Sequence, residues 1–246
     1  MVGIIGVFIF QNKIIFQADQ LDQDYIFKFN HPYKEYFIRA NDGEQLNVLL
    51  FPASESSKGL IVYFHGNADN LQRWGNNAVD FTDLGYDVLM MDFRGFGKSS
   101  GMPSEQALYE DGATVWKWAK QEFEHKKWVV YGRSLGTAVA SHVAIEANPD
   151  LLILETPFDE ISQGLPDILF PNPSENQFSN KDHLQKIQSR IVIIQGTDDW
   201  VVSESSAKRL IPYLKPGDDY VSIPGGGHKN LSEFDLFQET LRNLLQ

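Results

Sequence analysis

The chain has 246 residues, a formal net charge of -12 and no cysteine. This length is enough for one α/β domain with a full core and a pocket. The acidic balance argues against nucleic acid as a partner, because phosphates call for clustered Lys and Arg. The lack of cysteine excludes disulfides, thiolate catalysis and cysteine-ligated metals.

The amino terminus, residues 1–32, is expected to form an apolar extension of a main domain at 33–246. Its first ten residues are apolar apart from two glycines, too few for a helix to span a bilayer, which takes about 20. No basic residue precedes the run and no cleavage site follows it, so no signal peptide is predicted. Three interpretations stay open: a segment packed on the domain, a short interfacial anchor, or the stub of a longer membrane anchor. The expected location is cytoplasmic or membrane-associated.

Extended runs alternate with helix-like stretches along the rest of the chain. The expected strands are 36–39, 46–51, 60–64, 86–91, 128–131, 151–154, 191–194 and 220–223, and the expected helices lie near 70–84, 104–122, 135–147, 204–213 and 231–245. Most of the strands are continuously apolar, as in strands buried on both faces. The pattern predicts an α/β fold with a mostly parallel eight-stranded sheet, helices on both faces and an antiparallel N-terminal hairpin turning at 41–44.

A Gly-x-Ser-x-Gly pentad, residues 132–136, lies between the expected strand at 128–131 and a run of small helix-forming residues. A strand that turns abruptly into a helix holds its central residue in a strained conformation, and flanking glycines keep side chains out of the way. Ser134 is therefore a candidate nucleophile. The oxyanion of an acyl intermediate would need two backbone N-H donors, which we expect from Leu135 and from Asn67 in the loop after the strand at 60–64.

Two other loops carry residues that invite a catalytic or phosphate-binding interpretation. His65 is expected to buttress its own loop by hydrogen bonding rather than to act as a base. Gly97-Lys98-Ser99 suggests a P-loop, but the position that needs the first glycine is Asp92. We expect this loop to be a structural turn in which Arg94 pairs with a carboxylate or a carbonyl.

The base and the acid must come later in the chain. His228 follows the expected strand at 220–223, and the order Ser, Asp, His is the one that this sheet topology requires. Among the other histidines only His183 is a serious rival, because His31, His125 and His142 lie at the wrong place or the wrong end of their elements. For the acid, Asp198, Asp199 and Asp159 all lie near strand ends, and spacing alone does not choose among them.

Five motifs in this order resemble the α/β-hydrolase superfamily, and more narrowly the lidless ABHD-type serine hydrolases, which include protein depalmitoylases, monoacylglycerol lipases and lysophospholipase-like esterases. The matching residues are 65–68, 92–99, 132–136, 196–202 and 226–228. The resemblance covers the chain from about residue 33 and implies that Asp199 is the acid. Relatives usually carry His where this chain has Gln195, and we expect that difference to affect loop hydrogen bonding more than catalysis. Many relatives have an amino-terminal membrane anchor, which favours the anchor interpretation of residues 1–16.

The connection at 156–190 is too short for an elaborate cap domain, so we expect an open or thinly covered acyl site. Its apolar residues are expected mainly to pack rather than to line a pocket: Phe158, Leu165, Ile168, Leu169, Phe170 and Phe178.

These features predict a hydrolase of carboxylic esters or thioesters, acting on small-molecule or lipid acyl substrates, with no metal or organic cofactor. Ser134, His228 and Asp199 would form its triad. Two alternatives stay open: a serine peptidase of the same fold and a catalytically silent signalling or binding module.

Overall fold

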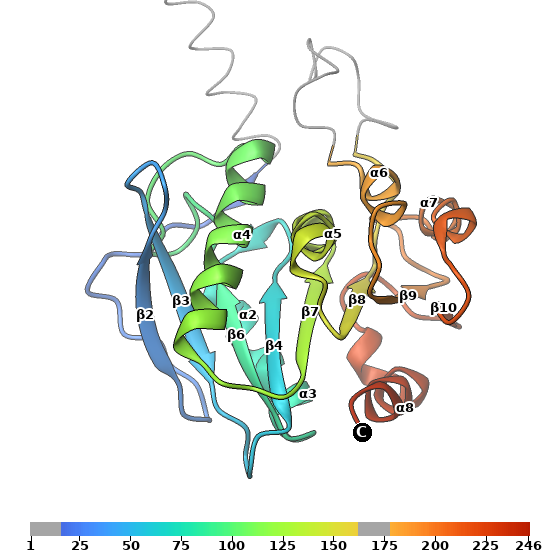
Figure 1. Cartoon of the computed structure of the whole chain (residues 1–246), viewed down its shortest axis with the longest axis horizontal. Helices are drawn as coiled ribbons and strands as arrows, with labels where there is room; N and C mark the ends of the chain where they lie inside the picture. The colour runs from blue at the N-terminus through green and yellow to red at the C-terminus, as the bar shows by residue number, and fades with distance from the viewer. Residues whose placement is uncertain (1–15, 162–177) are drawn as a thin grey trace, which may run out of the picture.

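The computed structural model describes residues 16–161 and 178–246 and contains an eight-stranded sheet in the order β10-β9-β8-β7-β4-β6-β3-β2 (Figure 1). The strands are β2 (Lys34–Arg39), β3 (Gln45–Phe51), β4 (Gly59–Phe64), β6 (Tyr86–Met91), β7 (Trp128–Arg133), β8 (Leu151–Glu155), β9 (Arg190–Gly196) and β10 (Asp219–Ile223). Strand β3 is antiparallel to β2 and β6, and the other neighbours are parallel. The predicted fold class, all eight expected strands and the amino-terminal hairpin are confirmed.

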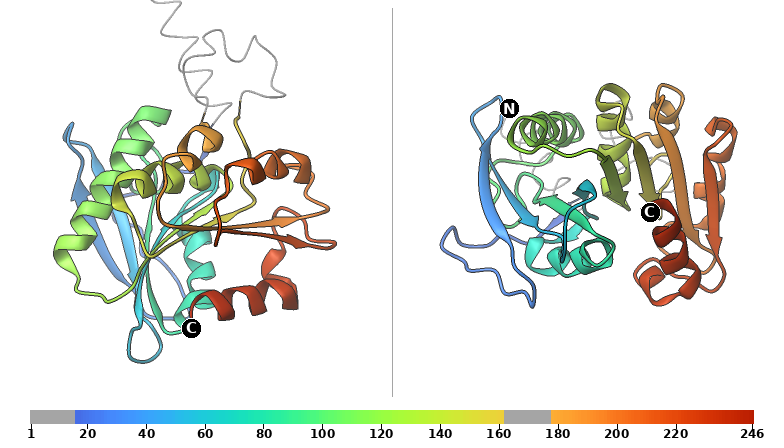
Figure 2. Two further views of the ribbon diagram at one scale, coloured as in Figure 1. Left: turned by 45° about the vertical axis from the view of Figure 1, so that its right-hand side comes forward. Right: turned by 60° about the horizontal axis from the view of Figure 1, so that its bottom comes forward.

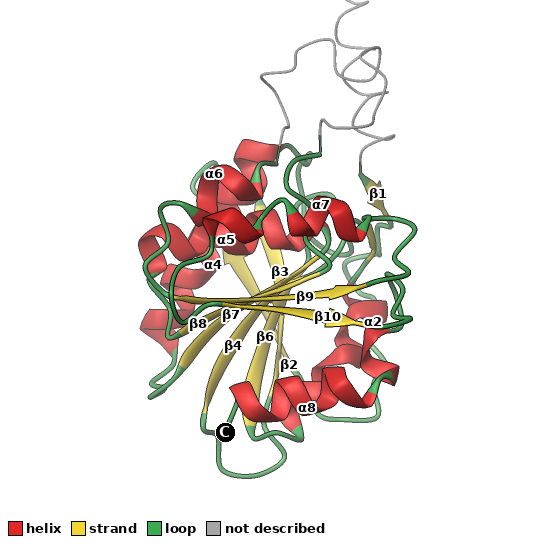
Figure 3. Cartoon of the chain, turned by 90° about the vertical axis from the view of Figure 1, so that its right-hand side faces the viewer, coloured by secondary structure: helices red, strands yellow, loops and turns green. Residues whose placement is uncertain are grey.

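Helices cover both faces of this twisted sheet, as the views from other sides show (Figures 2 and 3). The helical elements are α2 (Leu71–Trp74), η1 (Gly75–Ala78), α3 (Val79–Thr82), α4 (Glu105–Glu122), α5 (Leu135–Ala147), α6 (Asn180–Leu184), α7 (Glu204–Lys208), η2 (Ile211–Tyr213), η3 (Leu231–Glu233) and α8 (Asp235–Leu244). Helices α4, α5, α6 and α7 lie on one face, and α2 and α8 lie on the other. No helix in the described ranges is long and apolar enough to cross a membrane.

The continuously apolar strands are explained by burial on both sides. In β4, Leu60 and Val62 belong to the core under α4 and α5, whereas Ile61 and Tyr63 belong to the core under α2 and α8. All four residues are at most 1% exposed. Successive side chains of a strand point to opposite faces, so a helix layer on each face requires apolar residues at every position.

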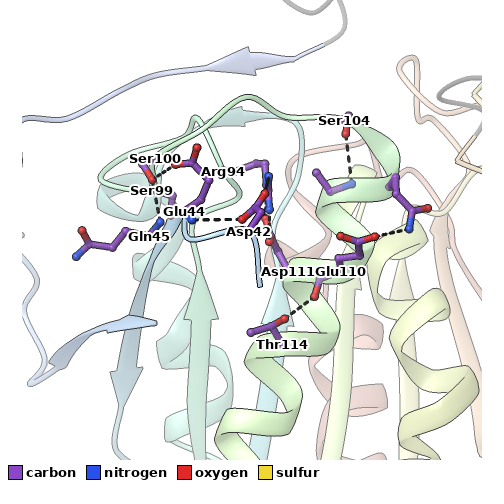
Figure 4. A network of polar contacts seen from close by, with 12 residues as sticks. Asp42, Glu44, Gln45, Arg94, Ser99, Ser100, Ser104, Glu110, Asp111 and Thr114 are labelled. Carbon is purple, nitrogen blue, oxygen red and sulfur yellow. Dashed lines mark hydrogen bonds and ion pairs between the residues drawn. The ribbon is translucent and has the colours of Figure 1, made fainter. Parts of the chain in front are cut away.

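The loop after β6 is a structural turn, as predicted, and Arg94 is its centre (Figure 4). The Arg94 guanidinium donates two hydrogen bonds of 2.6 Å to Asp111 in α4 and one of 2.7 Å to Asp42 in the hairpin turn. Lys98, which suggested a phosphate site, instead pairs with Glu35 at 3.0 Å and is 3% exposed. The loop therefore ties the hairpin and α4 to the sheet.

Element boundaries differ most from expectation in the helical regions near 70–84 and 204–213. The first consists of three short pieces that begin at Leu71, Gly75 and Val79, and an added Cβ on Gly75 would lie 2.5 Å from the ring of Phe29. The second stops after α7 and continues as the 3-10 turn η2, whose Pro212 limits helix hydrogen bonding. Helix α6 and the two-residue strands β1 (Gln17–Ala18) and β5 (Ala68–Asp69) were not expected at all.

The amino-terminal residues that the structure describes pack along the domain. Phe16 and Phe27 are 4% and 3% exposed, and Phe16 meets Phe178 edge to face with ring centroids 6.1 Å apart. In the connection at 156–190, Phe158 and Phe178 are buried in the core, in line with the expected packing role. The expected roles of Leu165, Ile168, Leu169, Phe170 and residues 1–15 fall outside the described residues.

Candidate active site

Ser134 lies on the turn between β7 and α5 with φ of 52° and ψ of -119°, a strained region for a residue with a side chain. The turn is tight because neighbouring backbone passes through the space that larger residues would need. A Cβ on Gly132 would lie 2.4 Å from the Gly136 oxygen, and a Cβ on Gly136 would lie 2.0 Å from the Phe64 oxygen. The Ser134 N-H donates to the Glu155 carbonyl at 2.9 Å, which holds the turn against β8.

His228 and Asp199 complete a line of hydrogen bonds that begins at Ser134. The Ser134 Oγ lies 3.1 Å from the His228 Nε2, and the His228 Nδ1 lies 2.8 Å from the Asp199 Oδ2. The three residues follow β7, β10 and β9, at the carboxyl ends of parallel strands. The structure thus brings together the three side chains that the sequence nominated for a triad, from positions 94 and 29 residues apart.

The Asp199 side chain is fully shielded from solvent and well supplied with donors. Its Oδ1 accepts the backbone N-H groups of Val201 and Val202 at 2.9 and 2.8 Å. Gln195 Nε2 lies 3.2 Å from the other oxygen. Burial raises the pKa of Asp199, but hydrogen bonding and charge interaction with His228 and the two backbone donors outweigh it and hold the pKa below its ordinary value. Asp199 is therefore set up to stay ionised beside the imidazole.

Gln195 acts on the loop, as expected, but also reaches the acid itself. Its Nε2 lies 3.1 Å from the carbonyl oxygens of Gly196 and Val202, in addition to the contact with Asp199. Gln195 is fully buried, so these contacts form in the absence of water competition.

The two other acid candidates lie elsewhere. Asp198 is exposed and bonds to Thr197 Oγ1 at 2.9 Å. Asp159 accepts from Ser206 and Arg209, and these partners hold its pKa below its ordinary value although burial by itself would raise it. Of the three carboxylates, Asp199 is the one that lies within hydrogen-bond distance of His228.

His183, the rival base, is occupied away from the site. Its Nδ1 lies 2.9 Å from Ser141 Oγ on the buried side of α5, and its ring meets the rings of His142 and Tyr109 at 5.1 and 5.2 Å. Burial first, and then the proximity of His142 and Lys186, lowers the pKa of His183 to about 4. This histidine belongs to a buried cluster between α4, α5 and α6.

The loop after β4 lies against the nucleophile. A Cβ on Gly66 would be 3.5 Å from the Ser134 Cβ and 3.0 Å from Trp74. His65 buttresses the loop as predicted: its Nδ1 lies 2.7 Å from the Gly66 oxygen and its Nε2 lies 3.4 Å from the buried carboxylate of Asp92. Asn67 follows directly in this loop, and Leu135 is the first residue of α5, a position at which the backbone N-H has no acceptor within a helix.

Arg133, the residue before Ser134, also reaches the triad. Its Nη2 donates to the His228 carbonyl at 3.0 Å, and its Nε lies 3.3 Å from Glu155 Oε1. Burial by itself lowers the pKa of Arg133. The Glu155 carboxylate has the opposite effect, and the pKa lies above its ordinary value, so the guanidinium is charged. The sequence analysis missed this pair, although a charged residue between a buried strand and a buried helix signals that a partner must be present.

Comparison with known proteins gives the family. A family model described as serine aminopeptidase, S33, matches residues 55–174. The chain is 31% identical over 194 residues to the lysophosphatidylserine lipase ABHD12 of Bos taurus, over 68% of this chain and 48% of that protein. It is 24% identical over 237 residues to the alpha/beta hydrolase domain-containing protein 17B of Xenopus tropicalis, over 93% of this chain and 80% of that protein.

A solved esterase of Pyrococcus furiosus has the same fold, with a TM-score of 0.75 and 18% identity over 94% of this chain and 96% of that chain. The chain belongs to the α/β-hydrolase superfamily. Its similarity to two ABHD proteins confirms the ABHD-type resemblance of the motifs. The chain spans about half of the ABHD12 protein.

No cluster of three or more metal-ligating side chains occurs in residues 16–161 and 178–246 of this α/β-hydrolase. His228 and Asp199 are engaged with each other and with Ser134. The side chains that the site brings into line are a hydroxyl, an imidazole and a carboxylate.

The buried histidine cluster predicts a pH-dependent stability. Unfolded His183 takes up a proton as pH falls below about 6.5, whereas folded His183 resists it down to about 4. Stability that is present above pH 6.5 is therefore lost as pH falls toward 4, by roughly 2–3 kcal/mol at most. Urea unfolding between pH 7 and pH 4.5 should show a smaller loss in His183→Gln than in the native chain.

The exposed Gln188, four residues beyond the end of α6, supplies a matched control. Gln188→Ala alters no titrating group and should keep the native pH dependence. An equal loss in native protein and His183→Gln would contradict the assignment to His183.

Proposed function

We propose that this protein is a serine hydrolase that cleaves carboxylic ester or thioester bonds through an acyl-enzyme. The single observation that carries the proposal is the line of hydrogen bonds from Ser134 Oγ through the His228 imidazole to Asp199, built on a strained strand-to-helix turn. A serine hydroxyl becomes a good nucleophile only when a base removes its proton during attack. A carboxylate on the far side of the imidazole selects the tautomer and stabilises the imidazolium.

In the first half-reaction, Ser134 Oγ attacks the acyl carbonyl and its proton passes to His228 Nε2. The oxyanion that forms is stabilised by the backbone N-H groups of Asn67 and Leu135. His228 then gives the proton to the leaving alkoxide or thiolate, and the carbon–oxygen or carbon–sulfur bond breaks. The acyl group is left as an ester on Ser134.

In the second half-reaction, His228 takes a proton from water, and the resulting hydroxide attacks the acyl carbonyl. The same oxyanion donors serve again, and the proton returns to Ser134 as the carboxylic acid leaves. Asp199 stays ionised throughout, in keeping with its lowered pKa. The chemistry needs no metal or organic cofactor, because every proton moves between groups of the chain, the substrate and water.

The relatives favour acyl esters, including lipid esters, as the substrate class. The ABHD12 relative is by name a lysophosphatidylserine lipase, and the Pyrococcus furiosus protein is by name an esterase. Both names describe hydrolysis of a carboxylic ester, the reaction that the Ser134 geometry suits. Contact of the amino terminus with a membrane would fit a lipid substrate and stays a prediction.

A peptidase is the second candidate, because the matching family model is described as a serine aminopeptidase. A panel of p-nitrophenyl esters of increasing chain length, run beside a panel of aminoacyl anilides, distinguishes the two. We expect turnover of the esters and little of the anilides, since no anchor for a peptide amino group has been identified among the described residues. Faster turnover of the anilides would reverse the assignment, and activity on neither panel would favour a silent module.

Ser134 itself is tested with a fluorophosphonate probe, which forms a covalent bond with an activated serine. The native chain should be labelled at one site, and Ser134→Ala should lose both the label and more than about 99% of ester turnover, because no other group replaces the nucleophile. Ser104→Ala is a control outside the site, since that hydroxyl caps α4. Labelling that persists in Ser134→Ala would contradict the proposal.

The acid is tested with a matched pair of neighbouring substitutions. Asp199→Asn should lower kcat by roughly 10³- to 10⁴-fold, because a neutral amide can neither select the imidazole tautomer nor stabilise its cation. Asp198→Asn should stay within about twofold of native kcat, since Asp198 is exposed and bonds to Thr197. The opposite ranking in steady-state assays would transfer the role to Asp198.

A further inference from the structure

The loop that carries His228 is built around three glycines, Gly225 to Gly227, which give it little stiffness of its own. Hydrogen bonds to neighbouring loops fix the glycines, and the Gly225 N-H donates to Thr197 Oγ1 at 2.8 Å. The Asp198 N-H donates to the Gly226 carbonyl at 2.8 Å, and the Gly227 N-H donates to Asn230 Oδ1 at 2.8 Å. At His228 the ring is bonded to Asp199 and Ser134, and the backbone carbonyl accepts a hydrogen bond from Arg133 Nη2.

We propose that Arg133 is a positioning residue for His228, holding the backbone of the base so that its ring stays in line with Ser134. The proposal rests on the serine hydrolase function proposed above. Arg133 directly precedes Ser134 in the chain, so its side chain connects the nucleophile turn to the backbone of the base. It is 8% exposed, so water competes little for its donors.

The buried carboxylate of Glu155 orients the Arg133 guanidinium. Glu155 is 3% exposed, and its Oε1 lies 3.3 Å from Arg133 Nε, while its Oε2 accepts the Tyr131 hydroxyl at 2.7 Å. The backbone oxygen of Glu155 also accepts the Ser134 N-H. One residue therefore holds the nucleophile through its main chain and orients Arg133 through its side chain.

The loop after β4 is held by the same cation. The Arg133 guanidinium carbon lies 5.5 Å from the ring centroid of Trp74, within cation-π range. Trp74 lies against Gly66 and donates from Nε1 to the Ala68 carbonyl at 2.6 Å. Arg133 thus contacts the base loop directly and the proposed oxyanion loop through Trp74.

Arg133 also has a hydrogen bond with the Tyr63 side chain, and its contacts with Glu155 and His228 use different nitrogens of one planar group. Nε faces Glu155 and Nη2 faces the His228 carbonyl. A lysine retains the positive charge but has a single nitrogen on a shorter reach, so it cannot make both contacts with the same geometry. Arg133→Lys therefore removes the positioning contact while leaving Glu155 a counter-charge.

The test is steady-state kinetics on a p-nitrophenyl ester with Arg133→Lys. We expect kcat to fall about 10- to 100-fold with KM within about twofold of native and a native-like melting temperature, because a small displacement of the base slows chemistry without altering substrate binding. Arg73→Lys is the matched control: Arg73 also lies over Trp74, at 5.2 Å, but is exposed and pairs with Asp69. It should keep native kcat.

A double-mutant cycle separates positioning from a general loss of structure. If Arg133 acts through His228, the losses from Arg133→Lys and His228→Ala should not add, and the double variant should be about as slow as His228→Ala alone. Additive losses would overturn the proposal, as would native kcat in Arg133→Lys.

If Arg133→Lys lowers the melting temperature, the double variant Arg133→Met with Glu155→Gln replaces it in the test. This double variant leaves no buried charge unpaired. That variant should show the same loss of kcat, and its absence would overturn the proposal. The proposed serine hydrolase function is contradicted by a different result, which is fluorophosphonate labelling that persists in Ser134→Ala. Loss of that label together with native kcat in Arg133→Lys would overturn the positioning role alone.

Discussion

The close approach of backbone at Ser134 is the constraint on which the site depends. Gly136 touches the carbonyl oxygens of Phe64 and His65, so the start of α5 and the end of β4 are in direct contact without a side chain between them. This contact places the nucleophile beside the loop that follows β4 and forces the positive φ of Ser134. The strain is sustained because strands on both sides, and the hydrogen bond from Ser134 to Glu155, leave the turn no room to relax.

Around this turn, the carboxyl edge of the sheet buries ionisable side chains, and they occur in pairs. Arg94 is matched by Asp111, Arg133 by Glu155, and His228 by Asp199. Removing a charge from water is costly, and a partner with good geometry is what makes it tolerable. The pairs join segments that are distant in sequence: Arg94 and Asp111 join the loop after β6 to α4, Arg133 and Glu155 join the end of β7 to β8, and His228 and Asp199 join the loops after β10 and β9. The edge that carries the chemistry is thus held by polar contacts, whereas the rest of the sheet is held by apolar packing.

Strands were predictable and short helices were not, for a physical reason. A strand buried on both faces, such as 60–64, must be continuously apolar, and that pattern is visible in the sequence alone. Helices α4 and α5 are long enough to show their own periodicity, but α6 has five residues and its stability comes from Asn180 and His183 contacts with α5. The lack of room for a side chain at Gly75 likewise comes from Phe29, which is 46 positions earlier in the chain and packs there only in the folded state.

The sequence alone determined the fold class and nominated Ser134 and His228, because a tight turn demands glycines and the topology demands an order of residues. It left three carboxylates open, and only the resemblance to a family favoured Asp199. The tertiary structure distinguished them: Asp199 faces the imidazole, Asp198 faces solvent and Asp159 is held by Arg209. The partners of Arg133 likewise could not be named from the sequence, because they come from β8 and from a loop 95 residues later. Local pattern specifies which backbone a segment adopts, but the direction of a polar side chain is decided by whichever distant groups the fold brings within reach of it.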